Sequence, residues 1–150
     1  MNLLQTIRAI EKAAADQPNV KTLVRNDIFR LNAIPDVKYG VVAWLQGEHT
    51  TAEPLSSLIT YNFTLFYVDR LTDDKGNEVE IQSQAIEVLE NILQELGEYG
   101  LFAGSHSFRT FNQRFSDECA GAFVVVSLEA QKDAICAEDF DIDNNDFSII

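Results

Sequence analysis

The stretch that most constrains the fold runs from Leu58 to Asp69, where apolar and polar side chains alternate. The apolar members of the series are Ile59, Tyr61, Phe63, Leu65 and Tyr67, and the polar ones between them are Thr60, Asn62 and Thr64. Successive side chains of a β-strand point to opposite faces of the sheet, so the pattern predicts a long strand with one buried and one polar face. A sheet that is covered on one side only is typical of antiparallel pairing.

Helical periodicity occurs both before and after this strand. Residues 2–5 have the form of a capping box, and apolar residues at helical spacing follow them until Pro18, which ends the predicted helix. A second apolar stripe predicts a helix over about Gln84–Leu96, with Gly97 as its stop signal.

Other segments predict further strands. Residues 39–46 are an apolar run that is typical of a strand, and two more strands are predicted near Ser105–Phe111 and Ala120–Glu129. Residues 19–38 are ambiguous, and Gly47–Pro54 is predicted to be a polar loop. The order of these elements predicts an α+β fold: a mainly antiparallel sheet of four to five strands with two helices packed on one face.

Length and charge limit the organisation and the partners. The 150 residues, 46% of them hydrophobic, predict a single domain over residues 1–131, followed by an acidic C-terminal tail over residues 132–150. A formal net charge of −13 argues against electrostatic capture of nucleic acid, which needs an excess of Lys and Arg. No signal peptide and no apolar run long enough for a membrane span is visible, which predicts an intracellular protein with Cys119 and Cys136 as free thiols.

Two groups of carboxylates are candidates for a metal site. Asp139, Asp141 and Asp143 have the spacing that begins a calcium loop, but the glycine and the bidentate carboxylate that follow in such a loop are missing. The three aspartates between positions 69 and 74 match no ligand spacing, and the Asp-Asp-Lys-Gly-Asn sequence that contains two of them is typical of a tight turn. We therefore predict no metal site and interpret residues 69–77 as the loop by which the chain leaves the long strand.

No active site is recognisable in the sequence. His49 and His106 have no neighbouring ligand motif, and Ser57, Ser105 and Cys119 lie in no nucleophile-elbow pattern. The glycines of the GEYGLFAGS stretch leave a helix, whereas a phosphate-binding loop enters one. We predict no enzyme activity, no catalytic residues and no cofactor; an acid-dependent hydrolase built on the aspartates of residues 69–74 stays open as an alternative.

Three stretches together resemble a known family: "DIFRLNAIPDVKYGVVAW", "YNFTLFYVDRLTDDKGNEVEIQSQAIEVLENILQEL" and "FNQRFSDECAGAFVVVSLEA". An alternating strand, a charged exit loop, an amphipathic helix and a Val-rich last strand follow one another as in the neck and tail-completion proteins of tailed bacteriophages. The resemblance covers most of residues 1–130 and leaves the acidic tail outside it.

The resemblance implies a structural role in the virion. Such proteins form closed rings, commonly of six or twelve copies, which lie between the portal or adaptor and the tail and form part of the DNA conduit. The chain would then be made in the cytoplasm of the host bacterium, as a head–tail connector or tail-terminator subunit through which DNA passes without specific binding. The alternative is a small intracellular module that binds a protein through a sheet edge.

A ring requires two different complementary surfaces on each copy. The basic first helix and the charged segment after the long strand are the best pair that the sequence offers. The predicted interface residues are Arg8, Lys12, Asp69, Arg70, Asp73, Asp74, Glu78 and Glu80.

Overall fold

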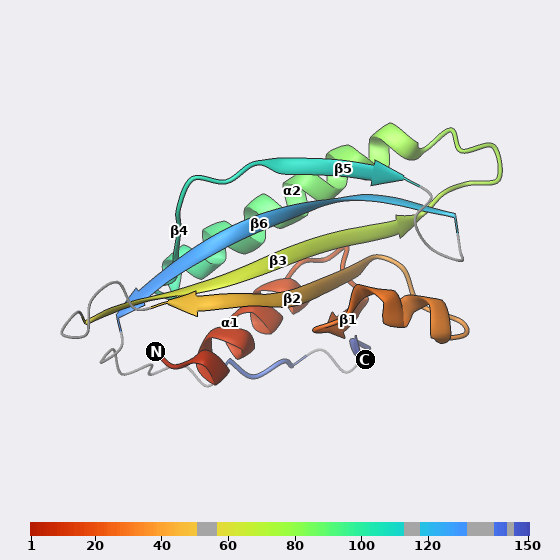
Figure 1. Cartoon of the computed structure of the whole chain (residues 1–150). Helices are drawn as coiled ribbons and strands as arrows, with labels where there is room; N and C mark the ends of the chain where they lie inside the picture. The colour runs from red at the N-terminus through yellow and green to blue at the C-terminus, as the bar shows by residue number, and fades with distance from the viewer. Residues whose placement is uncertain (51–56, 113–117, 132–139, 144–145) are drawn as a thin grey trace.

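A mixed β-sheet is the centre of the fold (Figure 1). The computed structural model describes residues 1–50, 57–112, 118–131, 140–143 and 146–150, and within them it contains seven strands, two α-helices and one 3₁₀ helix. In chain order the elements are α1 (Leu3–Ala15), β1 (Thr22–Arg25), η1 (Ile28–Ala33), β2 (Val41–Thr50), β3 (Leu58–Arg70), α2 (Glu78–Glu98), β4 (Phe102–Ala103), β5 (Phe108–Asn112), β6 (Cys119–Gln131) and β7 (Ser148–Ile149). The strand order is β4-β6-β3-β2-β1-β7, and β5 also pairs with β6.

The predicted α+β class is confirmed, but the sheet is larger and less regular than the four to five antiparallel strands that were expected. Strand β1 runs parallel to β2 and to β7, whereas the other pairs are antiparallel. The strands that the sequence did not predict are short: β1 has four residues, and β4 and β7 have two each. A run of two to four residues is too short to show an alternating pattern.

The long predicted strand is β3, and it is the central strand of the sheet. It pairs with β6 over its whole length, from Leu58 opposite Gln131 to Arg70 opposite Cys119. On its other side β2 continues to Thr50, so residues 47–50 belong to a strand and not to the predicted polar loop. The rest of that loop, residues 51–54, lies outside the described residues.

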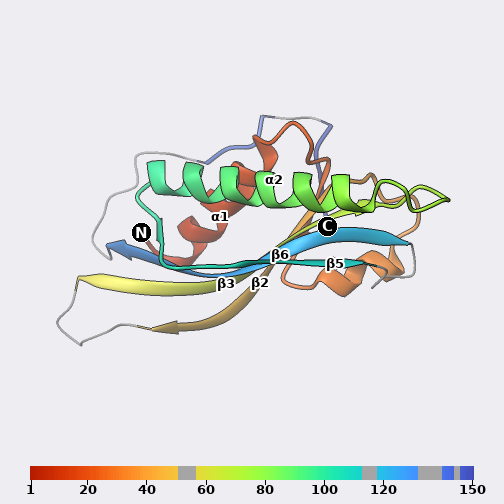
Figure 2. The same ribbon diagram turned by 90° about the horizontal axis from the view of Figure 1, so that it is seen from above.

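Both α-helices cover the same face of the sheet (Figure 2). The predicted capping box begins α1: Asn2 Oδ1 accepts the Gln5 backbone N–H, and Gln5 Oε1 accepts the Asn2 N–H, each at 2.9 Å. Helix α2 is longer than predicted and continues past Gly97. It ends in a Schellman motif, in which Gly100 has φ 87° and the Leu101 N–H donates to the Leu96 carbonyl at 2.9 Å.

The main core lies between these helices and the sheet. Strand β3 contributes Tyr61, Phe63, Leu65 and Tyr67, and α2 contributes Ala85, Val88, Leu89, Ile92, Leu93 and Leu96. Each large apolar side chain buried in this way contributes about 1.5–3 kcal/mol to folding. The covered face therefore carries most of the apolar stabilisation, as the alternation of β3 predicts.

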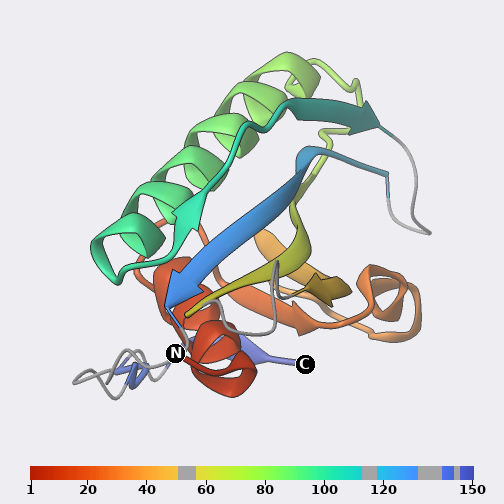
Figure 3. The same ribbon diagram turned by 60° about the vertical axis from the view of Figure 1, so that its left-hand side comes forward.

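The opposite face of the sheet is half covered, which corrects the expectation of a sheet covered on one side only. Figure 3 shows η1 and α2 on opposite sides of the sheet. Ile28 and Leu31 of η1 pack on the sheet residues Val41, Ala43 and Val68 in a second, smaller core. The rest of this face has no described element over it, and we call that part the open face.

The described part of the acidic 132–150 segment packs on the domain. Phe140 is 7% exposed and belongs to the main core, where its ring contacts that of Tyr99 with centroids 5.0 Å apart. Strand β7 then extends the sheet: the Ser148 N–H donates to the Lys21 carbonyl at 3.1 Å, and the Ile150 N–H donates to Leu23 at 2.8 Å. Three residues of this segment's acidic sequence, Asp141, Asp143 and Asp146, are described, and the calcium-type spacing at Asp139 lies outside the described residues.

Candidate subunit interface

The predicted basic surface on α1 is partly neutralised within the chain. Lys12 Nζ donates to Asp16 Oδ1 at 2.6 Å, and this hydrogen bond raises the pKa of the lysine. Arg8 lines a groove of about 300 Å³ together with Glu11, Arg25, Phe140, Asp141 and Ile142. Of the two helix residues predicted to bind a neighbouring copy, Lys12 is thus already paired, and Arg8 lies beside both acidic and basic groups.

A carboxyl pair lies beside Lys12, where α1 meets the C-terminal half of α2. Burial and a hydrogen bond with Asp16 raise the pKa of Glu95 to about 7, while the Tyr99 hydroxyl donates to Glu95 Oε1 at 2.6 Å. Burial opposes the ionisation of Asp16, but its hydrogen bonds with Glu95 and Lys12 outweigh this effect and lower its pKa. Glu95 therefore keeps its proton to a higher pH than an ordinary carboxyl group, while Asp16 is ionised, and we expect this helix contact to be sensitive to pH.

The charged segment after β3 forms a self-contained turn. Asp74 Oδ1 accepts hydrogen bonds from Thr72 Oγ1 at 2.6 Å and from the Gly76 N–H at 3.0 Å, and the Thr72 bond is the main cause of the lowered pKa of Asp74. Asn77 Oδ1 accepts the Thr72 N–H at 2.8 Å, and Lys75 forms an ion pair with Glu118 at 3.4 Å. These contacts match the interpretation of the segment as an exit loop.

The other predicted interface residues of this segment differ in how far they are accessible to a neighbouring copy. Burial raises the pKa of Asp69, whose Oδ1 accepts the Arg70 N–H at 2.7 Å. Glu78 Oε1 accepts the side-chain amide of Asn112 at 2.7 Å, which ties the start of α2 to β5. Asp73 and Glu80 are exposed. The start of α2 and Glu95, next to Lys12, are 17 residues apart in one helix, about 25 Å, so the two predicted surfaces lie at different ends of the molecule.

The open face carries an apolar surface that the sequence did not predict. In the β3–β6 and β5–β6 pairs, Phe66 and Arg109 both lie opposite Phe123. The Phe66 and Phe123 ring centroids are 5.6 Å apart, and that of Phe111 is 6.5 Å from Phe123. Val125 follows on the same face of β6 and is 61% exposed. Phe111 is buried, and Phe66 and Phe123 are half-buried beside the second core, so Val125 is the exposed end of this apolar strip.

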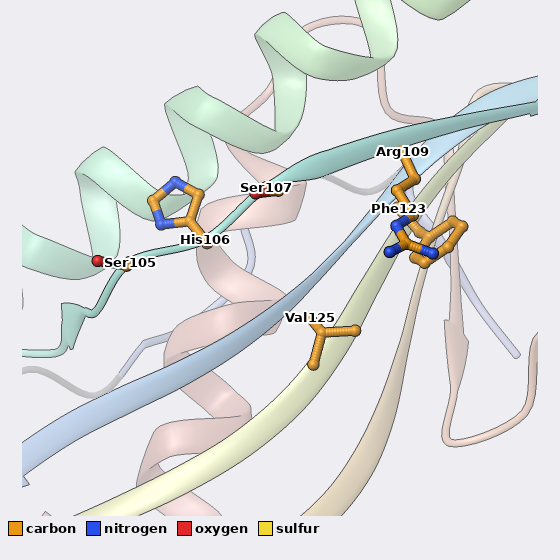
Figure 4. Close-up of a pocket in the computed structure, with 6 residues that line it drawn as sticks. All are labelled: Ser105, His106, Ser107, Arg109, Phe123 and Val125. Carbon is orange, nitrogen blue, oxygen red and sulfur yellow. The ribbon is translucent and has the colours of Figure 1, made fainter.

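A groove of about 490 Å³ runs along this strip (Figure 4). It is lined by Ser105, His106, Ser107, Arg109, Phe123 and Val125. Figure 4 shows the Arg109 guanidinium beside the Phe123 ring, and Val125 projecting from the same strand as Phe123. The periodicity of β6 concealed this surface, because Phe123-Val124-Val125-Val126 is a continuous apolar run in which the exposed positions cannot be told from the buried ones.

The candidate catalytic residues are engaged in structural contacts. His49 accepts the Asn62 N–H on Nδ1 at 3.3 Å, and its ring lies against Tyr61 and Phe63. His106 Nδ1 lies 2.8 Å from the Gly104 carbonyl, and Cys119 is buried and free of a disulfide. Cys136 lies outside the described residues.

The described ranges contain neither a cluster of metal ligands nor a helix that could span a membrane. There, no group of three or more His, Cys, Asp or Glu side chains is placed to hold a metal ion. Among the same residues, no helix is both long enough and apolar enough to cross a membrane.

A comparison with models of known protein families gives no match, and a comparison with curated proteins gives no significant match.

Proposed function

We propose that this chain is the structural subunit of a closed ring at the head–tail junction of a tailed bacteriophage, either a head–tail connector or a tail terminator. The ring would contain six or twelve copies, contact the portal or adaptor on one side and tail proteins on the other, and form part of the DNA conduit in the virion. The groove on the open face is the observation that carries this proposal, because it presents the exposed Val125 beside the half-buried Phe123, where a neighbouring subunit can cover both side chains.

Charge supports the same role. A conduit for DNA must not bind the passing phosphates, and a chain with 24 acidic and 11 basic residues repels them. Of the three stretches that resemble the phage family, the second covers most of β3 and α2, and the third covers most of β6. We infer no catalytic role, because His49 accepts the Asn62 N–H and packs on two aromatic rings, and the Cys119 side chain is buried.

The alternative function is a binding module that takes up a strand from a partner protein. The edge of β1 supports it, because β7, a strand of two residues, pairs there in parallel with Thr22 and Leu23. An edge that accepts a strand of its own chain has the geometry needed to accept one from a partner. Such a module needs neither closed symmetry nor a virion.

Native mass spectrometry of the purified protein tests the two proposals. A closed species of six or twelve copies, and labelling of the protein in purified phage particles, are expected for the ring. A protein that stays monomeric at all concentrations and is absent from particles contradicts the ring. Recovery of one stoichiometric partner that is not a virion protein supports the binding module.

A further inference from the structure

The groove on the open face presents a cation next to an apolar floor. Arg109 and Phe123 are cross-strand neighbours, and Val125 lies two residues further along the same face of β6. The ion pairs among the described residues are Lys12–Asp16, Arg25–Glu11 and Lys75–Glu118, so Arg109 is not matched by a carboxylate of the described chain. A fitting occupant therefore brings an acidic group directly beside an apolar side chain.

The first turn of α2 presents an acidic side chain directly beside an apolar one on its solvent side. Val79 is 74% exposed, and the exposed Glu80 follows it directly. Between residues 78 and 98 the helix contains six Glu and no Lys or Arg. Two of these carboxylates, Glu87 and Glu90, are exposed at i,i+3 spacing, where like charges destabilise a helix by about 0.2–0.5 kcal/mol. A cation from outside the helix relieves this repulsion.

The sheet separates the two surfaces within one chain. The groove lies on the open face, whereas α2 covers the opposite face (Figure 2). The groove of one copy can therefore bind the α2 surface only of another copy, and that copy's own groove stays available for the next. A contact between two different surfaces is heterologous, and it generates a closed ring or a filament.

We propose that the Arg109–Phe123–Val125 groove binds the Val79–Glu80 end of helix α2 of a second copy of this chain. Val79 would pack on Phe123 and Val125, while the Glu80 carboxylate would pair with the Arg109 guanidinium. This contact rests on the proposed ring function and specifies its interface. Glu80 was also part of the interface predicted from the sequence. Its proposed partner is now Arg109 and not Lys12, because the charge of Lys12 is already paired with Asp16.

Charge reversal on both sides of the contact tests the proposal. Arg109→Glu and Glu80→Arg are each expected to raise the protein concentration for half assembly by at least about tenfold, because each opposes like charges in the contact. The double variant Arg109→Glu/Glu80→Arg is expected to return to within about threefold of the wild type, because the pair is restored in reverse. Sedimentation velocity at fixed ionic strength measures assembly, and circular dichroism checks the fold of each variant.

Matched controls carry the same charge changes elsewhere. Glu98→Arg alters an exposed Glu at the other end of α2, about 27 Å from Glu80, and Arg30→Glu alters an exposed Arg of η1. Both are expected to assemble like the wild type. If either control weakens assembly as much as the test variants, the effect is one of net charge and the proposed contact is wrong.

A mixture of the two single variants gives a second and independent readout. The Arg109→Glu variant still has Glu80, and the Glu80→Arg variant still has Arg109. When the two variants alternate in a ring, every second contact is the native Arg109–Glu80 pair, and each contact between has the same pair with both charges reversed. The mixture is expected to assemble at concentrations where each variant alone does not, which requires an even number of copies. Failure of both the mixture and the double variant to assemble overturns the contact, as do single variants that assemble like the wild type.

The failure of this contact is distinguishable from failure of the ring. A wild type that forms a closed ring, together with variants that also form it, contradicts the contact alone. A wild type that remains monomeric contradicts the ring and the contact together.

Discussion

Trp44 of β2 donates its Nε1–H to Glu11 Oε2 of α1 at 3.1 Å, which ties the first helix to the sheet through a buried carboxylate. Arg25 of β1 donates to both oxygens of the same carboxylate, at 2.7 and 2.8 Å. Three elements thus share one charged group that is 3% exposed. A buried carboxylate is tolerated only where donors of this kind surround it.

Glu11→Ala is expected to lower the free energy of unfolding by about 2–4 kcal/mol, because it leaves the buried Trp44 N–H without an acceptor and removes the partner of Arg25. Urea denaturation followed by tryptophan fluorescence measures the change. Glu90→Ala, on the exposed side of α2, is the control and is expected to stay within about 0.5 kcal/mol of wild type. Equal stability of the two variants would mean that Glu11 is not a structural link.

Because the pKa of Glu95 is raised in the folded chain, we expect the free energy of unfolding to fall as the pH rises. In the unfolded chain this carboxyl ionises near its ordinary pKa of 4.5, whereas in the folded chain burial and Asp16 raise the pKa to about 7. Between these values the folded state holds a proton that the unfolded state has lost, so stability decreases through this window and is level above it. Because the carboxyl is only partly buried, solvent screening reduces the effect to about 1 kcal/mol.

Glu95→Gln is expected to remove this component of the pH dependence and to be more stable than the wild type at pH 8. Urea unfolding of both proteins between pH 5 and pH 8 measures the difference, in which the contributions of all other groups cancel. Glu90→Gln serves as the control and is expected to parallel the wild type. A Glu95→Gln profile that also parallels the wild type would show that the proton on Glu95 has no influence on folding.

Gly121 marks a close approach between β6 and β3. A Cβ atom at this position would overlap the Tyr67 carbonyl oxygen and would lie 3.1 Å from Phe111 Cζ. Gly121→Ala must therefore displace β3, and we expect it to destabilise the fold by about 2–4 kcal/mol. Gly104→Ala is the matched control, because its Cβ would meet nothing within 4 Å. Thermal melting of the two variants is the measurement, and equal midpoints would contradict this packing.

The parts of the fold that were predicted correctly are those with a repeated local pattern. Apolar and polar residues alternate from Ile59 to Leu65 in β3, and α2 carries an apolar stripe, so the residues on each side of the main core could be identified from the sequence. The capping box of α1 is equally local, since its two hydrogen bonds join residues three positions apart. These elements set the α+β class.

The parts that were not predicted depend on contacts between distant residues. Strand β1 is stabilised by β2 and β7, about 20 and 126 residues further along the chain, and its buried Thr22, Leu23 and Val24 show no alternation. The candidate groove depends on the β5–β6 register, which places Arg109 opposite Phe123. The sequence of one strand, whether its apolar pattern or its charges, does not determine its register with another strand. That register is fixed by the packing of the whole sheet.

Phe140 provides a test of whether the acidic C-terminal segment is part of the fold. The side chain is 7% exposed, contacts Tyr99 and belongs to the main core, although charged residues surround it in the sequence. Phe140→Ala is expected to lower the free energy of unfolding by about 3 kcal/mol, because it removes a buried ring and leaves a cavity between the C-terminal segment and α2. Phe102→Ala removes the same ring from a site that is 64% exposed, so it is expected to change stability by less than about 1 kcal/mol. Urea denaturation of both variants decides the point: if Phe140→Ala is as stable as Phe102→Ala, the segment does not contribute to the core and its acidic residues act outside the domain.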